Sequence, residues 1–297
     1  MIDQAAKLRE LMKTKNDNYE IDLKNENMAK VISVSSGKGG VGKTNFALNF
    51  AISLKRLGYD IVIIDSDIGL SNVEILSGVS LNYSMSDIVF SNKSIFEIMG
   101  EGPEGVKIIS GGSGLKELNL LRDENFPRLI YEIEKLQSSY DFIVIDTGAG
   151  ISNAVIDFIM TSNEVIIIST PDPTSLMDSY TLIKSIVSNG FTGQINIVSN
   201  LVNNRHEGKE VFDKLSTTVN NFLRVQIKYF GYIEKDRIVS NAIRNQVPFI
   251  ISHPNSNTAK KINIMAMNFL DKKLTTFENE KVGFAKKIFD IFSRRGG

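Results

Sequence analysis

The feature that most constrains the fold is an alternation of short apolar runs with helical patterns from Lys30 onward. Several runs are nearly continuous valine and isoleucine, which is typical of parallel strands buried on both faces. The predicted strands are Val31–Ser35, Ile61–Ile64, Val106–Ile109, Phe142–Ile145, Val165–Ser169, Ile195–Ser199 and Ile227–Tyr232. The predicted helices between them include Thr44–Leu57, Phe126–Ser138, Thr174–Ser188, Lys209–Leu223 and Ser256–Lys273. This alternation predicts a doubly wound α/β domain, with a mostly parallel sheet and helices on both faces.

The composition excludes several classes of function. Lysine and arginine number 34 and aspartate and glutamate also number 34, which disfavours a strongly basic nucleic-acid binder and an acidic disordered chain. The absence of cysteine excludes disulfides, thiol nucleophiles and cysteine-ligated zinc or iron–sulfur sites. We expect the two histidines, His206 and His253, to be incidental surface residues. No apolar signal core or membrane-length apolar run is present, so we expect a cytoplasmic protein.

A glycine-rich segment follows the first predicted strand and precedes the first predicted helix. From Gly37 to Thr44 it reads GKGGVGKT, which fits the phosphate-loop spacing G-x-x-x-x-G-K-[ST]. Glycines let backbone N–H groups surround a phosphate, and the helix N-terminus adds a favourable dipole end. We expect Lys43 to reach the β- and γ-phosphates and the Thr44 hydroxyl to ligate Mg²⁺. The predicted nucleotide contacts here are Gly37, Lys38, Gly39, Gly40, Val41, Gly42, Lys43, Thr44 and Asn45.

Two further predicted strands end in aspartates. Ile61–Ile64 leads into Asp65-Ser66-Asp67, and Phe142–Ile145 leads into Asp146. The carboxyl ends of parallel strands meet at the edge of the sheet where α/β proteins bind ligands. Phosphoryl transfer needs mainly positioning and charge neutralisation, so one carboxylate and one Mg²⁺ would suffice.

The segment from Lys38 to Thr44 resembles the deviant Walker A motif of MinD and ParA positioning ATPases, nitrogenase iron protein and arsenite-pump ATPases. The resemblance implies the P-loop NTPase fold of MinD and a slow, partner-regulated, Mg²⁺-dependent ATPase. It implies that Lys38 touches the nucleotide of a partner subunit; a solvated loop lysine is the alternative. It also implies that Asp67 orients the attacking water, that Asn72 lies in the same switch loop, and that Asp146 holds Mg²⁺ through water. The implied catalytic residues are Lys38, Lys43 and Asp67, and the implied metal residues are Thr44, Asp67 and Asp146.

The adenine pocket is predicted from the same resemblance. Asn200, after the predicted strand Ile195–Ser199, matches the position that hydrogen-bonds adenine in the family. Asn203 and Asn204 are alternatives at this strand end. ATP and Mg²⁺ are therefore the implied cofactors, with Asn72 and Asn200 added to the nucleotide contacts.

Within this superfamily, the lack of cysteine disfavours the nitrogenase iron protein, iron–sulfur scaffold and arsenite-pump branches. MinD, ParA and the flagellar-number ATPase family FlhG (also called FleN or YlxH) remain. The chain resembles FlhG over essentially its whole length, with the strongest signals in Asp3–Arg9, Leu81–Ile88, Glu101–Gly114 and the basic C-terminal segment. The implied organisation is a partner-binding arm and linker over residues 1–29, an ATPase domain over 30–275 and a membrane-targeting helix over 276–297.

The C-terminal segment has the pattern of an amphipathic helix. Ala285, Ile288, Phe289 and Phe292 are spaced i, i+3, i+4 and i+7, with Phe284 beside them, and residues 281–297 hold five basic residues against one acidic. Such a helix favours the interface of an anionic membrane, with Phe284, Ile288, Phe289 and Phe292 as predicted membrane contacts. The alternative is a helix docked on the protein's own surface. Both hold if it is docked with ADP and released with ATP.

The N-terminal arm carries a short apolar stripe but no phosphate or metal chemistry. The FlhG resemblance implies that Asp3, Gln4, Ala5 and Leu8 bind and stimulate an FlhF-type GTPase. A frayed extension that packs on its own domain is the alternative.

Together, these features predict an ATP-dependent homodimer that regulates the number and placement of flagella. It would be cytoplasmic, bind the cytoplasmic membrane peripherally and reversibly, and stimulate an FlhF-type GTPase. Flagellar components or a flagellar transcription regulator are further candidate partners. The alternative is a MinD- or ParA-like ATPase that positions the division site, a cargo or DNA, although the zero net charge disfavours DNA.

Overall fold

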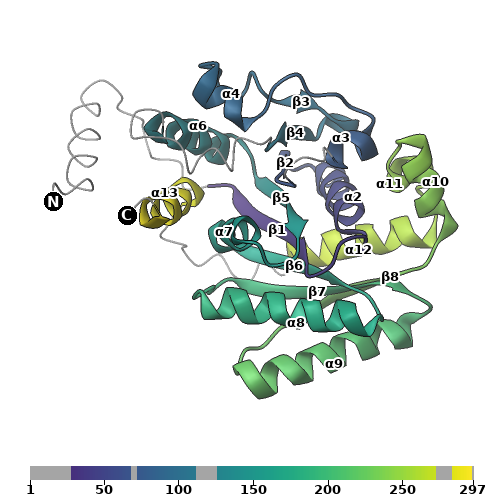
Figure 1. The fold of residues 1–297 in the computed structure, drawn as a ribbon. Helices are drawn as coiled ribbons and strands as arrows, with labels where there is room; N and C mark the ends of the chain where they lie inside the picture. Colours follow the sequence, from purple (N-terminus) through teal and green to yellow (C-terminus); the bar gives the residue numbers. More distant parts are fainter. Residues whose placement is uncertain (1–27, 68–71, 112–125, 272–282, 296–297) are drawn as a thin grey trace.

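The computed structural model describes residues 28–67, 72–111, 126–271 and 283–295 (Figure 1). Within these ranges, eight strands form one sheet in the order β3-β4-β2-β5-β1-β6-β7-β8. All neighbouring strands pair in parallel except β3 and β4. The strands are β1 (Lys30–Ser36), β2 (Ile61–Asp65), β3 (Gly100–Glu101), β4 (Lys107–Ser110), β5 (Phe142–Ala149), β6 (Glu164–Ser169), β7 (Gln194–Val202) and β8 (Lys228–Glu234). The predicted doubly wound α/β fold is confirmed.

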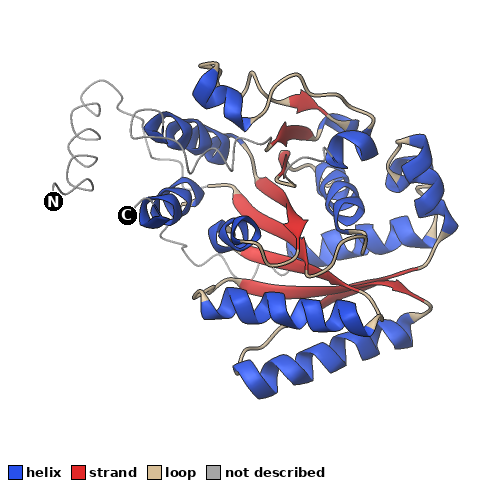
Figure 2. Cartoon of the chain, in the orientation of Figure 1, coloured by secondary structure: helices blue, strands red, loops and turns tan. Residues whose placement is uncertain are grey.

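Helices cover both faces of the sheet (Figure 2). In chain order they are α2 (Lys43–Arg56), α3 (Asn72–Ser77), α4 (Met85–Phe90), the short 3₁₀ helix η1 (Pro103–Gly105), α6 (Phe126–Ser139), α7 (Asn153–Thr161), α8 (Pro173–Ser188), α9 (Arg205–Leu223), α10 (Arg237–Asn245), α11 (Phe249–Ser252), α12 (Asn257–Asp271) and α13 (Phe284–Arg295). Helices α2 and α12 lie on one face, and α6, α7, α8, α9 and α13 lie on the other.

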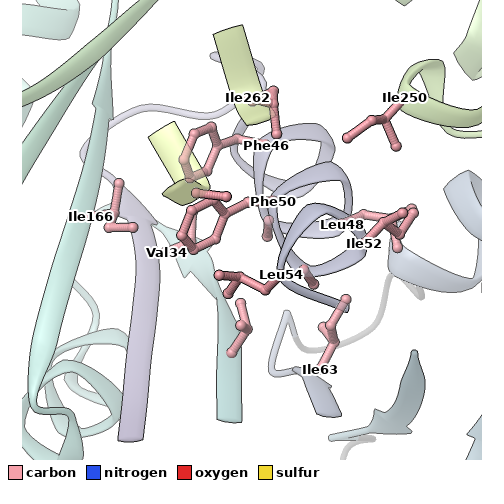
Figure 3. Close-up of a cluster of buried hydrophobic side chains, with 14 of the residues drawn as sticks. Val34, Phe46, Leu48, Phe50, Ile52, Leu54, Ile63, Ile166, Ile250 and Ile262 are labelled. Atoms are coloured by element: carbon pink, nitrogen blue, oxygen red, sulfur yellow. The ribbon is translucent and has the colours of Figure 1, made fainter. Parts of the chain in front are cut away.

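The strands are apolar on both sides because each side faces a helical layer. Along β1, Ile32 and Val34 join the cluster under α2 and α12, whereas Val31 joins the cluster under α6 and α13. In the first cluster, Phe46 and Phe50 of α2 stack with ring centroids 5.4 Å apart (Figure 3). This packing fixes the start of α2, and therefore the phosphate loop before it.

Helix α13 docks on the α/β domain beside α6 and α7. Its Phe284, Ala285 and Ile288 are buried in one cluster with α6 and with Phe158 of α7. The sequence left two environments open for this helix, and the structure shows the docked one. None of the helices in the described ranges is long and apolar enough to cross a bilayer.

Candidate nucleotide site

The glycine-rich loop runs from the end of β1 to the start of α2, at the carboxyl edge of the sheet. Gly37 presses against α8, because a Cβ built there would lie 2.3 Å from the backbone carbonyl carbon of Asp178. Gly42 has a left-handed backbone (φ 90°), and a Cβ there would meet the Asn200 amide nitrogen at 2.4 Å. The loop is therefore held from two sides by close contacts that leave no room for larger residues.

Lys43 and Asp146 form a buried ion pair at the centre of this edge. The Lys43 Nζ donates to Asp146 Oδ1 at 2.8 Å, and their side chains are only 7% and 0% exposed. Burial raises the pKa of Asp146, while the Lys43 charge opposes that rise. Both residues lie at the edge of the sheet where the sequence placed them, and their roles toward phosphate and Mg²⁺ stay predictions.

The residues present fit a Mg²⁺ ion. The second Asp146 oxygen, Oδ2, is buried with no hydrogen-bond partner among the described residues, so it can accept a metal-bound water. The Thr44 hydroxyl lies 3.4 Å from Lys43 Nζ, next to the same carboxylate. Within the described ranges, no group of three or more His, Asp or Glu side chains is arranged to hold a metal ion by itself. Such a sparse set suits Mg²⁺, which takes most of its ligands from phosphate and water.

The switch segment after β2 is organised by Asp65, whose role was not predicted. Its carboxylate accepts the N–H groups of Asp67 at 3.1 Å and Val73 at 3.0 Å, on either side of the undescribed residues 68–71. Burial, with Asp146 nearby, raises the pKa of Asp65 to about 7. The only sequence signal for it was its place as the first aspartate of the strand-end motif.

Asp67, the predicted water-orienting residue, is itself positioned by a neighbour. Asn72 donates from Nδ2 to Asp67 Oδ2 at 3.0 Å. The structure therefore brings Asp67 and Asn72 together, and it gives Asn72 a carboxylate partner.

Lys38 is held by the same chain's helix α8. Its Nζ lies 2.5 Å from Asp172 Oδ2 and 2.5 Å from Thr174 Oγ1, at the N-terminus of α8. This hydrogen bond from Lys38 lowers the pKa of Asp172 to about 2. The Lys38 side chain is 41% exposed, so it is accessible as well as paired.

Asn200 holds the phosphate loop through a side-chain hydrogen bond to its backbone. Its Nδ2 donates to the Val41 carbonyl at 2.7 Å, and the side chain is buried. The predicted adenine contact is thus engaged with the loop backbone. Asn203 and Asn204, its alternatives, both hydrogen-bond to Glu207.

A cavity of about 330 Å³ opens beside the loop. Its walls include Lys38, Val41, Pro171, Leu201, Glu207 and Lys235. The cavity continues from the phosphate loop toward the ends of β7 and β8, which is where a nucleoside attached to loop-bound phosphates would extend. Leu201, Glu207 and Lys235 line this cavity, and no motif in the sequence marks them.

The predicted membrane residues of α13 lie away from this edge. Phe284, Ile288 and Phe289 are on α13, with Phe289 partly buried against the same cluster. Phe292 is also on α13, but its side chain, like the arm residues Asp3, Gln4, Ala5 and Leu8, lies outside the described part.

Known proteins resemble this chain in sequence and in fold. The family model described as ParA, NUBPL iron-transfer P-loop NTPase, matches residues 27–270. The antiactivator FleN of Pseudomonas aeruginosa is 32% identical over 77% of this chain and 82% of its own length. The flagellum site-determining protein YlxH of Helicobacter pylori is 32% identical over 93% of this chain and 92% of its own. The MinD structure with Mg-ADP from Pyrococcus horikoshii has a TM-score of 0.67 at 20% identity, covering 85% of this chain and 100% of that one.

Proposed function

The chain belongs to the ParA/MinD family of P-loop ATPases, and from that premise we propose that it sets the number and placement of flagella. The observation that carries this proposal is the match over most of the chain to YlxH, a flagellum site-determining protein, together with the match to the antiactivator FleN. The similarity to solved MinD structures, at about 20% identity, supports the fold alone.

The ATP-dependent step is a dimerisation in which Lys38 changes partners. Within one chain Lys38 pairs with Asp172, and both side chains are partly exposed. An exposed ion pair contributes little stability, so a triphosphate presented by a second copy can displace it. We therefore expect Lys38→Ala to bind ATP yet stay monomeric in light scattering. An ATP-dependent Lys38→Ala dimer would refute the role of Lys38 across the interface.

The membrane step is the release of α13. Phe284, Ile288 and Phe289 would exchange the surface of α6 for the acyl boundary of an anionic bilayer, where the basic residues of α13 meet lipid headgroups. One such helix binds weakly and reversibly, whereas a dimer presents two and gains avidity. Nucleotide state would thus control localisation.

Sedimentation with vesicles tests this cycle. The protein is mixed with phosphatidylglycerol vesicles or with DNA, each with ATP or ADP. We expect sedimentation with vesicles in ATP only, and persistent binding of Asp67→Ala, which holds ATP without hydrolysing it. Loss of residues 281–297 should abolish vesicle binding but keep the ATP dimer. Sedimentation with DNA instead would favour the ParA-like alternative.

The flagellar role is tested in the source cell. Deleting the gene should change the number or position of flagella seen by electron microscopy, and the wild-type gene should restore them. Asp67→Ala should not restore them. Normal flagellation with misplaced division septa would favour the MinD-like alternative.

The arm is proposed to stimulate an FlhF-type GTPase through Asp3, Gln4, Ala5 and Leu8. A peptide of residues 1–20 should accelerate GTP hydrolysis by FlhF, and Gln4→Ala should weaken it without changing ATP turnover. An inert peptide, together with full stimulation by an arm-deleted chain, would refute the role.

A further inference from the structure

Helix α13 covers an apolar surface that belongs to the ATPase domain. We call this surface the α6/α7 groove; it comprises Leu129, Ile133 and Leu136 of α6 and Phe158 of α7, all buried in the cluster that holds Phe284, Ala285 and Ile288. Lys287 adds a polar contact at the edge, from its Nζ to the Ser162 carbonyl at 3.4 Å. If α13 leaves, the apolar side chains of α6 and α7 that it contacts lose their cover.

The N-terminal arm enters the domain at the end of the same groove. The Ala29 N–H donates to the Gln137 carbonyl of α6 at 2.8 Å, and Ala29 is buried in the groove cluster. Met28 lies beside the start of α13, because a Cβ built on Gly283 would be 3.2 Å from the Met28 sulfur. Met28 and Ala29, which follow the arm, therefore lie beside the start of α13.

The arm has the reach and the pattern to occupy the groove. Ile2, Ala5, Leu8 and Met12 recur at helical spacing and form an apolar stripe. A helix of a dozen residues is about 18 Å long, which is the length of α13 itself. The polar residues 13–27 between the stripe and Met28 can span up to about 50 Å, more than is needed to fold back along the groove.

An empty apolar groove is unfavourable in water, whereas a covered one is not. The arm is tethered at the groove, so its effective concentration there is high and no second molecule is required. We propose that residues 1–12 dock in the α6/α7 groove when α13 leaves it, so that the arm and α13 are alternative occupants of one surface.

This exchange deepens the proposed function and rests on it for the release of α13 by ATP and membrane. Its consequence is that the arm is free for a partner while α13 is docked and covered while α13 is on the membrane. Partner binding by the arm and membrane binding by α13 would then exclude one another in one molecule.

Hydrogen exchange measured by mass spectrometry on the full-length chain tests the exchange of occupants without lipid. Ile288→Asp places a carboxylate in the groove and should undock α13. We expect amides of residues 284–295 to exchange faster in this variant and those of residues 1–12 to exchange at least about tenfold more slowly than in the wild type. Adding a peptide of residues 281–297 should compete for the groove and return the arm to fast exchange.

Arm variants in the Ile288→Asp background supply the matched control. Leu8→Asp interrupts the apolar stripe and should abolish the protection, whereas Lys7→Asp changes charge on the opposite side of the helix and should retain it. Equal arm exchange in wild type and Ile288→Asp would overturn the proposal, as would protection that the peptide leaves unchanged. Arm protection in Ile288→Asp with no vesicle binding by the wild type would refute only the membrane step of the proposed function.

Discussion

Helices α2 and α13 both pack on the α/β domain, but they differ in how much of their surface is buried. Ten of the 14 residues of α2 are buried, and its aromatic rings contact strands and α12 on several sides. Among residues 284–291 of α13, whose burial is described, Phe284, Ala285 and Ile288 are buried, and they lie on one side of the helix. The difference teaches that a helix buried on most sides is a fixed part of the fold. A helix buried along one stripe can detach while the rest of the domain stays folded.

Lys43 and Lys38 of the phosphate loop show the same contrast between a buried and an exposed contact. Lys43 is buried against a buried carboxylate, whereas Lys38 is paired with an exposed one. Desolvated pairs resist separation and exposed pairs do not. Lys43 is therefore fixed in place, whereas Lys38 is free to exchange its partner, as the proposed dimerisation requires.

The largest effect should follow from removing the buried lysine. Lys43→Ala leaves Asp146 without its cation and the nucleotide without a phosphate contact, so we expect ATP turnover to fall by about 10²–10³-fold or more, with weakened nucleotide binding. Phosphate release and nucleotide titration measure both. Lys55→Ala is the matched control, since Lys55 lies on the same helix and pairs with Asp60 at its surface. Turnover within a few-fold of wild type would contradict the assignment of Lys43.

The next effect concerns the scaffold itself. Phe50→Ala removes a fully buried ring that contacts Phe46, Phe230 and Phe269, and we expect the free energy of unfolding to drop by about 3–5 kcal/mol. Denaturant unfolding followed by circular dichroism measures the change. Leu57→Ala, just past the end of α2 and 41% exposed, should change stability far less. Equal losses in the two variants would show that α2 is not the fixed element.

Shortening the stripe of α13 should have a smaller and local effect. Ile288→Ala should lower the free energy of global unfolding by no more than about 1–2 kcal/mol, because the helix can detach before the sheet unfolds. Exchange of the amides of residues 284–295 should accelerate, while that of α2 stays unchanged. A matching acceleration in α2 would mean that α13 is part of the scaffold.

The smallest effect should come from the exposed pair. The pKa of Asp172 is lowered to about 2 from its ordinary value of 3.8, so its contribution is present above about pH 4 and is lost as the pH falls through about 2. We expect Asp172→Asn to lower stability slightly at neutral pH, with the difference from wild type disappearing between about pH 4 and pH 2. Denaturant midpoints at several pH values measure it. A difference that grows on acidification would contradict the pairing.

The strands and the phosphate loop were predictable because their signals are local. The continuous Val/Ile runs placed the ends of β1, β2 and β5 within a few residues, and the loop motif located Lys43 and Thr44. The short helix α7 was missed because its nine residues carry no cap pattern stronger than Ser152 before them. Short helices of this kind depend on packing rather than on sequence periodicity.

The partners of the polar residues were less predictable because they are distant in sequence. Lys38 meets Asp172, and Asn200 meets the Val41 carbonyl, through the pairing order of β1, β6 and β7. A strand-end position gives the edge on which a side chain lies, but not the atom it binds. The roles of Lys38 across a dimer and of Asn200 toward adenine stay predictions.

The contact of Gly37 with α8 couples the position of the phosphate loop to that of the helix. Loop and helix touch there through backbone atoms, with no flexible side chain between them to absorb a displacement. Close-packed interiors transmit strain, so any shift of the loop moves this turn of α8 as well. Met177, adjacent to Asp178 on α8, is 65% exposed, so a fluorescent probe at position 177 would test whether nucleotide binding at the loop displaces α8.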